Sequence, residues 1–371
     1  MQQVEALGNG TCSTIISVQE IVRSDAENIP ERYIRNPDDR AKSSEISLVP
    51  DDRLPVIDFS LLAQGDEEER RKLDVACKEW SFFQIINHGA EEALPKVKAA
   101  AAQFFDLPLS EKKKYAMPPD YFEGYGQDDK AEDRKRDWID LLWLLTMPPH
   151  SRNTKYWPLT LPGFGEAVEE YATEMQRVTY EILGNLSLLM GVERDVLKQL
   201  HGEVKQGTRM NYYPACARPD LVFALSPHCD YTSISFVLQD DDITALQIKH
   251  KGMWVPVKPI PNAISVLVGD VMEKQQLSRC KTVVNLSWSN GKYKSLEHRA
   301  VANMEKPRNS VISFVIPSDE AELNPLKTMV DDDHPPIYKN GVTYIEYLLY
   351  TQNKETDEDK YVNIDYLKIQ N

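Results

Sequence analysis

The spacing of apolar residues changes partway along this 371-residue chain, and the change limits the folds that are open to it. Between residues 164 and 192, apolar side chains recur every three or four positions, which predicts one long amphipathic helix. They are Val168, Tyr171, Met175, Val178, Ile182, Leu186 and Leu189. From about residue 204, short apolar stretches are separated by Pro, Gly, Asn and Asp, as in an antiparallel barrel or a double-sheet jelly roll. The sequence therefore predicts an α+β protein.

The first half of the chain has the pattern of a mainly helical layer. Helical spacing and strand-forming composition predict helices over 68–80, 93–108 and 109–116, and short strands over 54–62 and 82–89. Ser110 is the expected cap of the third helix.

No flexible linker separates the two halves, so we expect a single unit in which the helical layer supports the β-core. The predicted regions are an N-terminal arm over 1–50 with one short helix, a mostly helical region over 51–203, a β-core over 204–318 and a tail over 319–371. The tail has one more helical stretch, around 342–350.

The charge and the cysteines exclude several classes of protein. A net charge of −15 repels phosphate backbones and offers no basic patch to anionic lipids, so we expect neither nucleic acid nor membrane as a partner. No apolar run approaches the length of a membrane span. The five cysteines are scattered and form no CxxC pair, which favours reduced thiols in a cytoplasmic protein. We expect a monomer.

One short stretch, LSPHCD, brings an imidazole and a carboxylate two positions apart in a strand pattern. Residues i and i+2 of a strand share a face, so His228 and Asp230 would converge on one point. The pair is either a local ion pair or two thirds of a metal site. Any single one of the seven histidines is more often a surface or core residue than a metal ligand.

A third and a fourth element strengthen the metal interpretation. His298 follows a hairpin signal, and ten residues later Arg308 and Ser310 share a strand face. Two histidines and one carboxylate form the facial triad of non-haem Fe(II) oxygenases, which leaves positions for a 2-oxo acid and O2. The planar guanidinium of an arginine suits the far carboxylate of such an acid. A zinc hydrolase could use the same three ligands, but hydrolysis needs no clamp of this kind.

These motifs resemble the plant 2-oxoglutarate/Fe(II)-dependent dioxygenases, a family that includes anthocyanidin synthase, flavonol synthase, the codeine and thebaine O-demethylases and senescence-related members. The stretches LPVIDFSLL, ACKEWSFFQIINHG, MNYYPAC, LSPHCD, WSNGKYKSLEHRAV and RNSVISF carry the resemblance, which covers most of the chain. It implies a double-stranded β-helix (jelly-roll) core, a ferrous ion, 2-oxoglutarate and O2 as co-substrates, and stimulation by ascorbate.

The resemblance also implies roles for individual residues. His228, Asp230 and His298 would be the iron ligands, and Arg308 and Ser310 would hold the distal carboxylate of 2-oxoglutarate. Tyr213 resembles the tyrosine that hydrogen-bonds the same carboxylate, and Asn211 would lie beside the metal-bound end; they are in the stretch MNYYP.

The substrate is less constrained by the sequence. Leu141, Trp143, Tyr231 and Phe314 occupy positions that suggest a flat, aromatic small molecule, although plain core packing explains each of them as well. No charged residue stands out as a counter-ion for the substrate. We expect hydroxylation or O-demethylation of an aromatic compound of plant specialised metabolism, such as a flavonoid or an alkaloid.

One segment departs from the family pattern. In similar enzymes a strand like VGDVME runs almost directly into the hairpin WSNGKYKS, whereas here residues 274–287 lie between them. His228 and His298 are consequently 70 residues apart. The segment is either a tolerated surface loop or a splice-derived insertion, and it leaves open an impaired paralogue that binds ligand without turnover.

Overall fold

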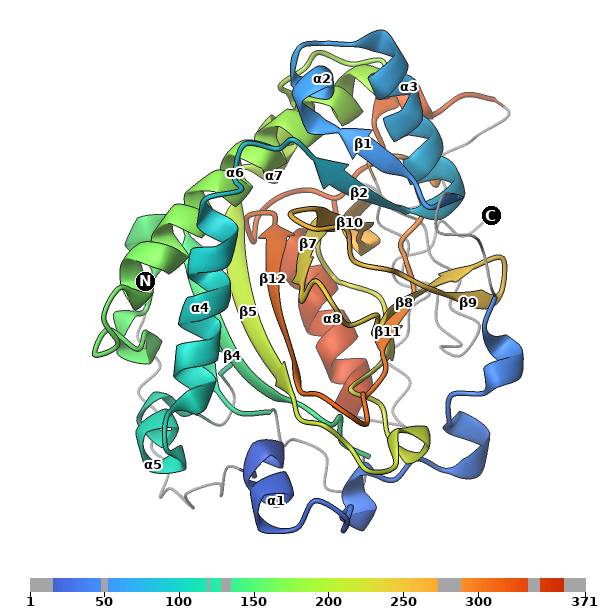
Figure 1. Ribbon diagram of the computed structural model, residues 1–371. Coiled ribbons are helices and arrows are strands. Elements are labelled where there is room, and N and C mark those ends of the chain that lie inside the picture. Colours follow the sequence, from blue (N-terminus) through green and yellow to red (C-terminus); the bar gives the residue numbers. More distant parts are fainter. Residues whose placement is uncertain are drawn as a thin grey trace.

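Two β-sheets enclose the core of the molecule (Figure 1). The computed structural model describes residues 16–47, 53–118, 121–127, 135–272, 288–332 and 341–356. The larger sheet has the strand order β1-β2-β10-β7-β12-β5-β4-β3, and the smaller sheet has the order β6-β11-β8-β9. Apolar side chains of both sheets pack together between them, among them Ile312 of the larger sheet and Ile248 of the smaller one.

The second half of the described chain supplies the eight strands of a jelly roll, four to each sheet. They are β5 (Lys205–Tyr213), β6 (Leu225–His228), β7 (Ile234–Gln239), β8 (Leu246–His250), β9 (Met253–Pro256), β10 (Ile264–Val268), β11 (His298–Ala300) and β12 (Arg308–Ile316). The predicted α+β fold with a jelly-roll core and a supporting helical layer is confirmed.

The first half extends the larger sheet at both of its edges. Its strands are β1 (Val56–Asp58), β2 (Phe82–Ile86), β3 (Gly124–Tyr125) and β4 (Asp140–Met147). β2 pairs with β10, and β4 pairs with β5. The N-terminal region is therefore continuous with the jelly roll, as the lack of a linker in the sequence suggested.

Two long helices, α4 (Ala93–Asp106) and α6 (Phe164–Leu189), pack against each other and against strands of the larger sheet (Figure 1). The apolar stripe that predicted α6 is buried at Val168, Met175 and Ile182, which are 0% exposed. The remaining helices are α1 (Val18–Ser24), α2 (Phe59–Ala63), α3 (Glu67–Val75), α5 (Leu109–Lys112), α7 (Val196–His201) and α8 (Tyr344–Thr356). No helix in the described ranges combines the length and the apolar character that a membrane span requires.

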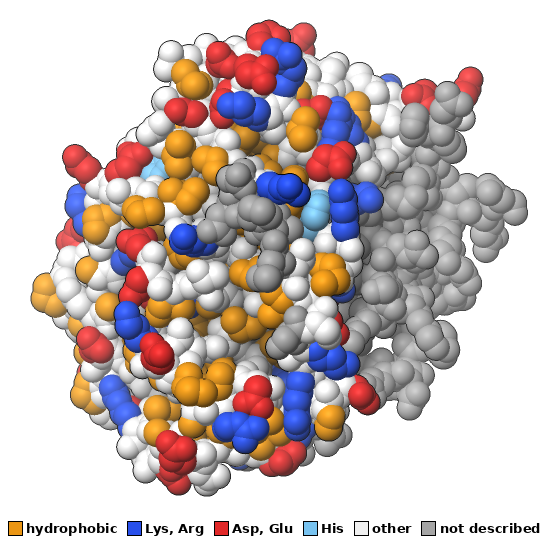
Figure 2. Space-filling model, turned by 45° about the vertical axis from the view of Figure 1, so that its right-hand side comes forward, with side chains coloured by type: hydrophobic (Ala, Val, Ile, Leu, Met, Phe, Trp, Pro, Cys, Tyr) orange, Lys and Arg blue, Asp and Glu red, His pale blue; other side chains and the backbone are white. Residues whose placement is uncertain are grey.

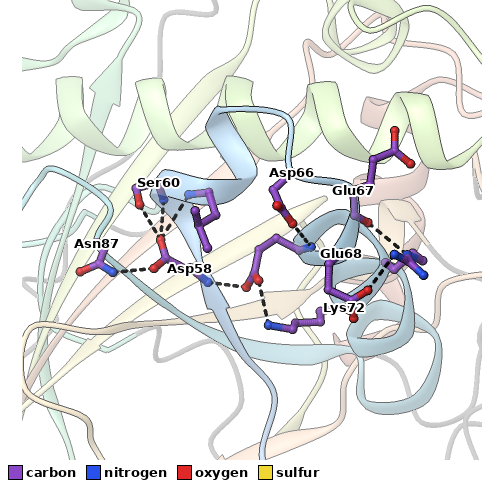
Figure 3. A network of polar contacts seen from close by, with 10 residues as sticks. Asp58, Ser60, Asp66, Glu67, Glu68, Lys72 and Asn87 are labelled. Carbon is purple, nitrogen blue, oxygen red and sulfur yellow. Dashed lines mark hydrogen bonds and ion pairs between the residues drawn. The ribbon is translucent and has the colours of Figure 1, made fainter.

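Side-chain caps shift several element boundaries away from the sequence prediction. The strand expected over 54–62 ends at Asp58, because the carboxylate of Asp58 accepts the backbone N–H groups of Ser60 and Leu61 and so starts helix α2. The same carboxylate accepts a hydrogen bond from Asn87 at 2.7 Å, and the N–H of Asp58 donates to Glu69 of α3 (Figure 3). These contacts join the first helices to β1 and to the end of β2.

Two other local predictions need correction. The predicted serine cap at Ser110 is wrong: α5 begins at Leu109 with Pro108 in the cap position, so Ser110 lies inside the helix. The helix predicted over 68–80 is regular only to Val75, and a π-helical turn, Ala76–Trp80, completes it. The segment 274–287 lies outside the described residues.

Candidate active site

Strand register brings the two candidate histidine ligands face to face. His298 opens β11 and lies directly opposite His228, the last residue of β6, in an antiparallel pair. Their ring centroids are 4.2 Å apart. The 70-residue separation in sequence therefore ends in a cross-strand contact.

Asp230 completes the group from a loop and not from a strand. The sequence analysis placed His228 and Asp230 on one strand face, but β6 ends at His228 and Asp230 follows it in the connection to β7. Asp230 Oδ1 lies 3.5 Å from His228 Nε2, and Asp230 Oδ2 lies 3.9 Å from His298 Nε2. One ligand atom from each of the three residues lies within 4.8 Å of the other two.

A neighbouring loop fixes the position of Asp230. The N–H of Asp270 donates to the carbonyl of Asp230 at 2.9 Å, and the N–H of Val271 donates to the carbonyl of Thr232 at 3.1 Å. Gly269 lies so close to this loop that an added Cβ would be 2.1 Å from the carbonyl oxygen of Thr232. A glycine is therefore required there, and the two loops pack closely together.

Each of the two imidazoles is oriented by a hydrogen bond from Nδ1 to a backbone carbonyl two residues earlier. Nδ1 of His228 lies 2.8 Å from the carbonyl of Ser226, and Nδ1 of His298 lies 3.1 Å from the carbonyl of Leu296. A carbonyl only accepts, so each Nδ1 carries a proton and each Nε2, the other ring nitrogen, is directed toward Asp230. This is the arrangement that metal-binding histidines adopt.

Electrostatics prepare the three side chains for a cation. Burial alone would raise the pKa of Asp230, but the imidazoles of His298 and His228 outweigh it and hold that pKa well below its usual range. Burial, with the repulsion of His228 added, lowers the pKa of His298 to about 4. At neutral pH the group therefore offers one carboxylate and a neutral His298. This donor set fits a divalent transition metal such as iron.

The candidate co-substrate residues also meet across paired strands. Arg308 lies opposite Tyr213, and Ser310 lies opposite Asn211, in the pairing of β12 with β5. Asn211 Nδ2 donates to Tyr213 Oη at 3.0 Å and lies 3.2 Å from Ser310 Oγ.

Two polar atoms in this cluster are buried without a partner among the described residues: Nε of Arg308 and Oδ1 of Asn211. Burial of an unpartnered polar atom is costly, so its presence indicates a place for a ligand. A donor on a guanidinium is suited to a carboxylate, which fits 2-oxoglutarate at this position.

The four candidate substrate residues are placed differently. Phe314 lines the pocket that contains Asp230 and His298, and Leu141 packs beside Tyr213. Trp143 is half-buried on the same face of β4 as Leu141. Tyr231 does not line that pocket: its ring packs against Tyr347 of α8 at 6.2 Å. The ring of Tyr231 therefore packs against a helix that lies more than a hundred residues later in the chain. No local sequence pattern reveals that contact.

Among the pocket residues that the sequence analysis did not name, Arg209 on β5 is a charged one. Arg209, Asn211 and Tyr213 are two positions apart in succession, so their side chains share one face of the strand. Asn211 and Tyr213 were named as site residues, and the same alternation along the strand, continued two residues toward the N-terminus, would have predicted Arg209 as well.

Comparison with known proteins identifies the family. Residues 54–162 match the model of the N-terminal domain of a non-haem dioxygenase in morphine synthesis, and residues 204–317 match the model of the 2OG-Fe(II) oxygenase superfamily. The chain belongs to the 2OG-Fe(II) oxygenase superfamily. Its cofactor is iron, its co-substrate is 2-oxoglutarate, and it is a dioxygenase.

Individual members of the superfamily match over almost the whole chain. Lateral branching oxidoreductase 1 of Arabidopsis thaliana is 38% identical, covering 96% of this chain and 96% of its own. Codeine O-demethylase of Papaver somniferum is 34% identical, covering 98% of each. The crystal structure of JOX2 in complex with 2OG, Fe and JA superposes with a TM-score of 0.79 at 30% identity, covering 91% of this chain and 93% of that one.

Proposed function

We propose that this dioxygenase hydroxylates or O-demethylates an aromatic small molecule of plant specialised metabolism, such as a flavonoid or an alkaloid. One observation carries the proposal: His228, Asp230 and His298 converge beside a pocket that Phe314 lines. The similarity to codeine O-demethylase supports removal of a methyl group as the reaction. The jelly-roll region 204–318 would carry the chemistry, and 51–203 would support it.

His228, Asp230 and His298 would hold the iron, which supplies O2 activation and oxidative decarboxylation of 2-oxoglutarate when bound. Arg308 and Ser310 would hold the distal carboxylate of the co-substrate, with Tyr213 and Asn211 beside them. Phe314, Trp143 and Leu141 would exclude water and orient an aromatic ring. For a methyl ether, the balanced reaction converts substrate, O2 and 2-oxoglutarate into the free hydroxyl compound, formaldehyde, succinate and CO2.

We further propose that the protein acts as a cytoplasmic monomer on small molecules and binds no nucleic acid. On the face seen in Figure 2, Lys and Arg side chains lie among Asp and Glu side chains, which supports this reading, as does the net charge of −15.

The test is a turnover assay with Fe(II), ascorbate and 2-oxoglutarate against pooled flavonoids and alkaloids. Succinate with formaldehyde selects O-demethylation, and succinate without formaldehyde points to hydroxylation or desaturation. The alternative, an impaired paralogue, predicts tight ligand binding without succinate. The short distances between Asp230 and the two histidines favour turnover over that alternative.

A further inference from the structure

Arg209 is a cation placed on the inner face of the jelly roll. It lies on β5 between Trp143 of β4 and Ile312 of β12 in the strand register. Its side chain lines the same pocket as Asp230, His298 and Arg308.

Within the described part of the chain, Arg209 makes no ion pair and no hydrogen bond, and its Nε is buried without a partner. Its one described side-chain contact is with the ring of Phe314, 5.3 Å from the guanidinium carbon. Two other arginines with buried polar atoms have a protein partner for their charge: Arg35 pairs with Asp137 at 2.6 Å, and Arg299 stacks on Trp254. A guanidinium left in a pocket without an anion is costly unless a ligand supplies the anion.

The charge balance of the pocket points the same way. Asp230 is its only lining carboxylate, whereas three of its lining residues are arginines. Arg299 directs its guanidinium away, onto Trp254 and Gln247. Arg308 is assigned to the co-substrate, and a divalent ion would adjoin Asp230. The positive charge of Arg209 then has no counterpart among the described residues that line the pocket, nor in 2-oxoglutarate.

Arg209 lies too far along the strand to belong to the co-substrate clamp. Arg308 is opposite Tyr213, four residues from Arg209, which is about 13 Å along β5. Arg209 nonetheless lines the same pocket as Asp230 and His298. It is therefore near the reacting centre but at the end away from the clamp.

Two aromatic residues neighbour Arg209: Phe314, whose ring faces its guanidinium, and Trp143, which lies opposite it on β4. Trp143 lies over Gly207, where an added Cβ would be 2.3 Å from the indole ring, so only glycine admits that ring position. Phe122 meets Trp143 edge-on with the ring centroids 4.8 Å apart. An aromatic ligand could contact Trp143 and Phe314 while an anionic substituent reaches the guanidinium.

We propose that Arg209 binds a carboxylate carried by the aromatic substrate and thereby selects anionic over neutral substrates. The inference rests on the proposed function, because it concerns the substrate of the same site. It gives that substrate an acidic group, which the sequence did not indicate.

The test compares aromatic carboxylates of one to three rings, among them 4-methoxycinnamate and 2-naphthoate, each with its own methyl ester. Binding is measured by calorimetry on the anaerobic complex with Fe(II) and 2-oxoglutarate, so that no turnover is needed. Wild type is expected to bind at least one acid about tenfold or more tightly than its ester. Arg209→Gln should abolish that preference without changing the affinity for the ester, and Arg209→Lys should retain part of it.

Arg218→Gln is the matched control, because Arg218 is an exposed arginine paired with Asp220 at 2.7 Å. It should leave the acid preference unchanged. The proposal is overturned if no acid is preferred by wild type, if Arg209→Gln weakens acid and ester equally, or if it weakens 2-oxoglutarate instead.

The proposed function is scored separately, by succinate release. An acid that binds through Arg209 without releasing succinate would overturn the proposed function and leave the binding inference intact. Oxidation of neutral compounds, with no preference for acids in binding, would support the proposed function and overturn the inference about Arg209.

Discussion

The hydroxyl of Ser289 donates a hydrogen bond of 2.5 Å to the carbonyl oxygen of Met272. Met272 lies just before the segment 273–287, and Ser289 lies just after it. Packing and hydrogen bonds fix the chain at both ends of the segment. Met272 is 1% exposed, and the buried indole of Trp288 donates to the carbonyl of Glu322 at 3.0 Å. The two ends of the segment therefore lie close together in the core, which is the geometry in which added length costs least.

Deletion of 274–287 is expected to preserve the fold and to leave iron binding intact or improved. The deletion joins Glu273 to Trp288, so Met272 and Ser289 become the first and fourth residues of a tight turn, a spacing that suits their present contact. Fe(II) titration and thermal unfolding of the deletion variant would measure both effects.

A variant in which glycine and serine replace 274–287 at equal length is the control for that deletion. It should behave like wild type if the segment is only a connection. Complete loss of folding and of iron in the deletion variant would instead make the segment structural.

Arg308→Gln is expected to raise the KM for 2-oxoglutarate about tenfold or more, because it removes the charge that holds the distal carboxylate. Ser310→Ala should have a smaller effect, since it removes one uncharged donor and leaves the guanidinium of Arg308 in place. Neither should change the Fe(II) affinity measured without co-substrate. A loss of iron in Arg308→Gln would show that this arginine supports the metal centre and not the diacid.

The sequence predicted elements and site residues well where the residue types and their spacing indicate the same structure. It predicted less where the position of a side chain depends on a segment far away in the chain. The stripe through Val168 and Ile182 predicted α6, and the spacing of His228, Asp230 and His298 predicted the cluster that the structure brings together. The sequence could not show that Asp230 is held in a loop, because the contacts that hold it come from 269–271. Nor could it orient Tyr231, whose partner is on α8.

Tyr347→Phe is expected to weaken Fe(II) binding about tenfold while leaving the fold intact. The hydroxyl of Tyr347 donates to Asp270 Oδ2 at 2.7 Å, and the N–H of Asp270 holds the carbonyl of Asp230. Loss of such an outer contact around a metal ligand commonly costs about 10- to 100-fold in metal affinity. An Fe(II) titration, with circular dichroism to check the fold, measures the effect.

Tyr180→Phe is the control for this substitution, since Tyr180 lies on α6 with Lys198 over its ring and touches no part of the metal loop. It should bind iron like wild type. Equal affinities in Tyr347→Phe and Tyr180→Phe would exclude α8 from a role in positioning Asp230.

His201 should make the stability of the protein depend on pH between about 6.5 and 4. Nδ1 of His201 lies 2.6 Å from the carbonyl of Leu197, and Nε2 lies 2.8 Å from Ser233 Oγ, and the ring is buried. Burial lowers its pKa to about 4, below the value of 6.5 in the unfolded chain. The unfolded state therefore binds the proton more tightly, and the stability that His201 contributes is complete above pH 6.5 and is lost as the pH falls toward 4.

The size of that loss is at most about 3 kcal/mol, from the difference between the two pKa values. His201→Gln should start from a lower free energy of unfolding at pH 7, since it loses the packing of the ring, but should decline less steeply between pH 6.5 and 4. His150→Gln, at an exposed histidine beside Glu203, should follow the wild-type profile. Urea unfolding at several pH values measures the slopes. Parallel profiles for wild type and His201→Gln would show that folding does not lower the pKa of His201, contrary to the neutral ring that its burial favours.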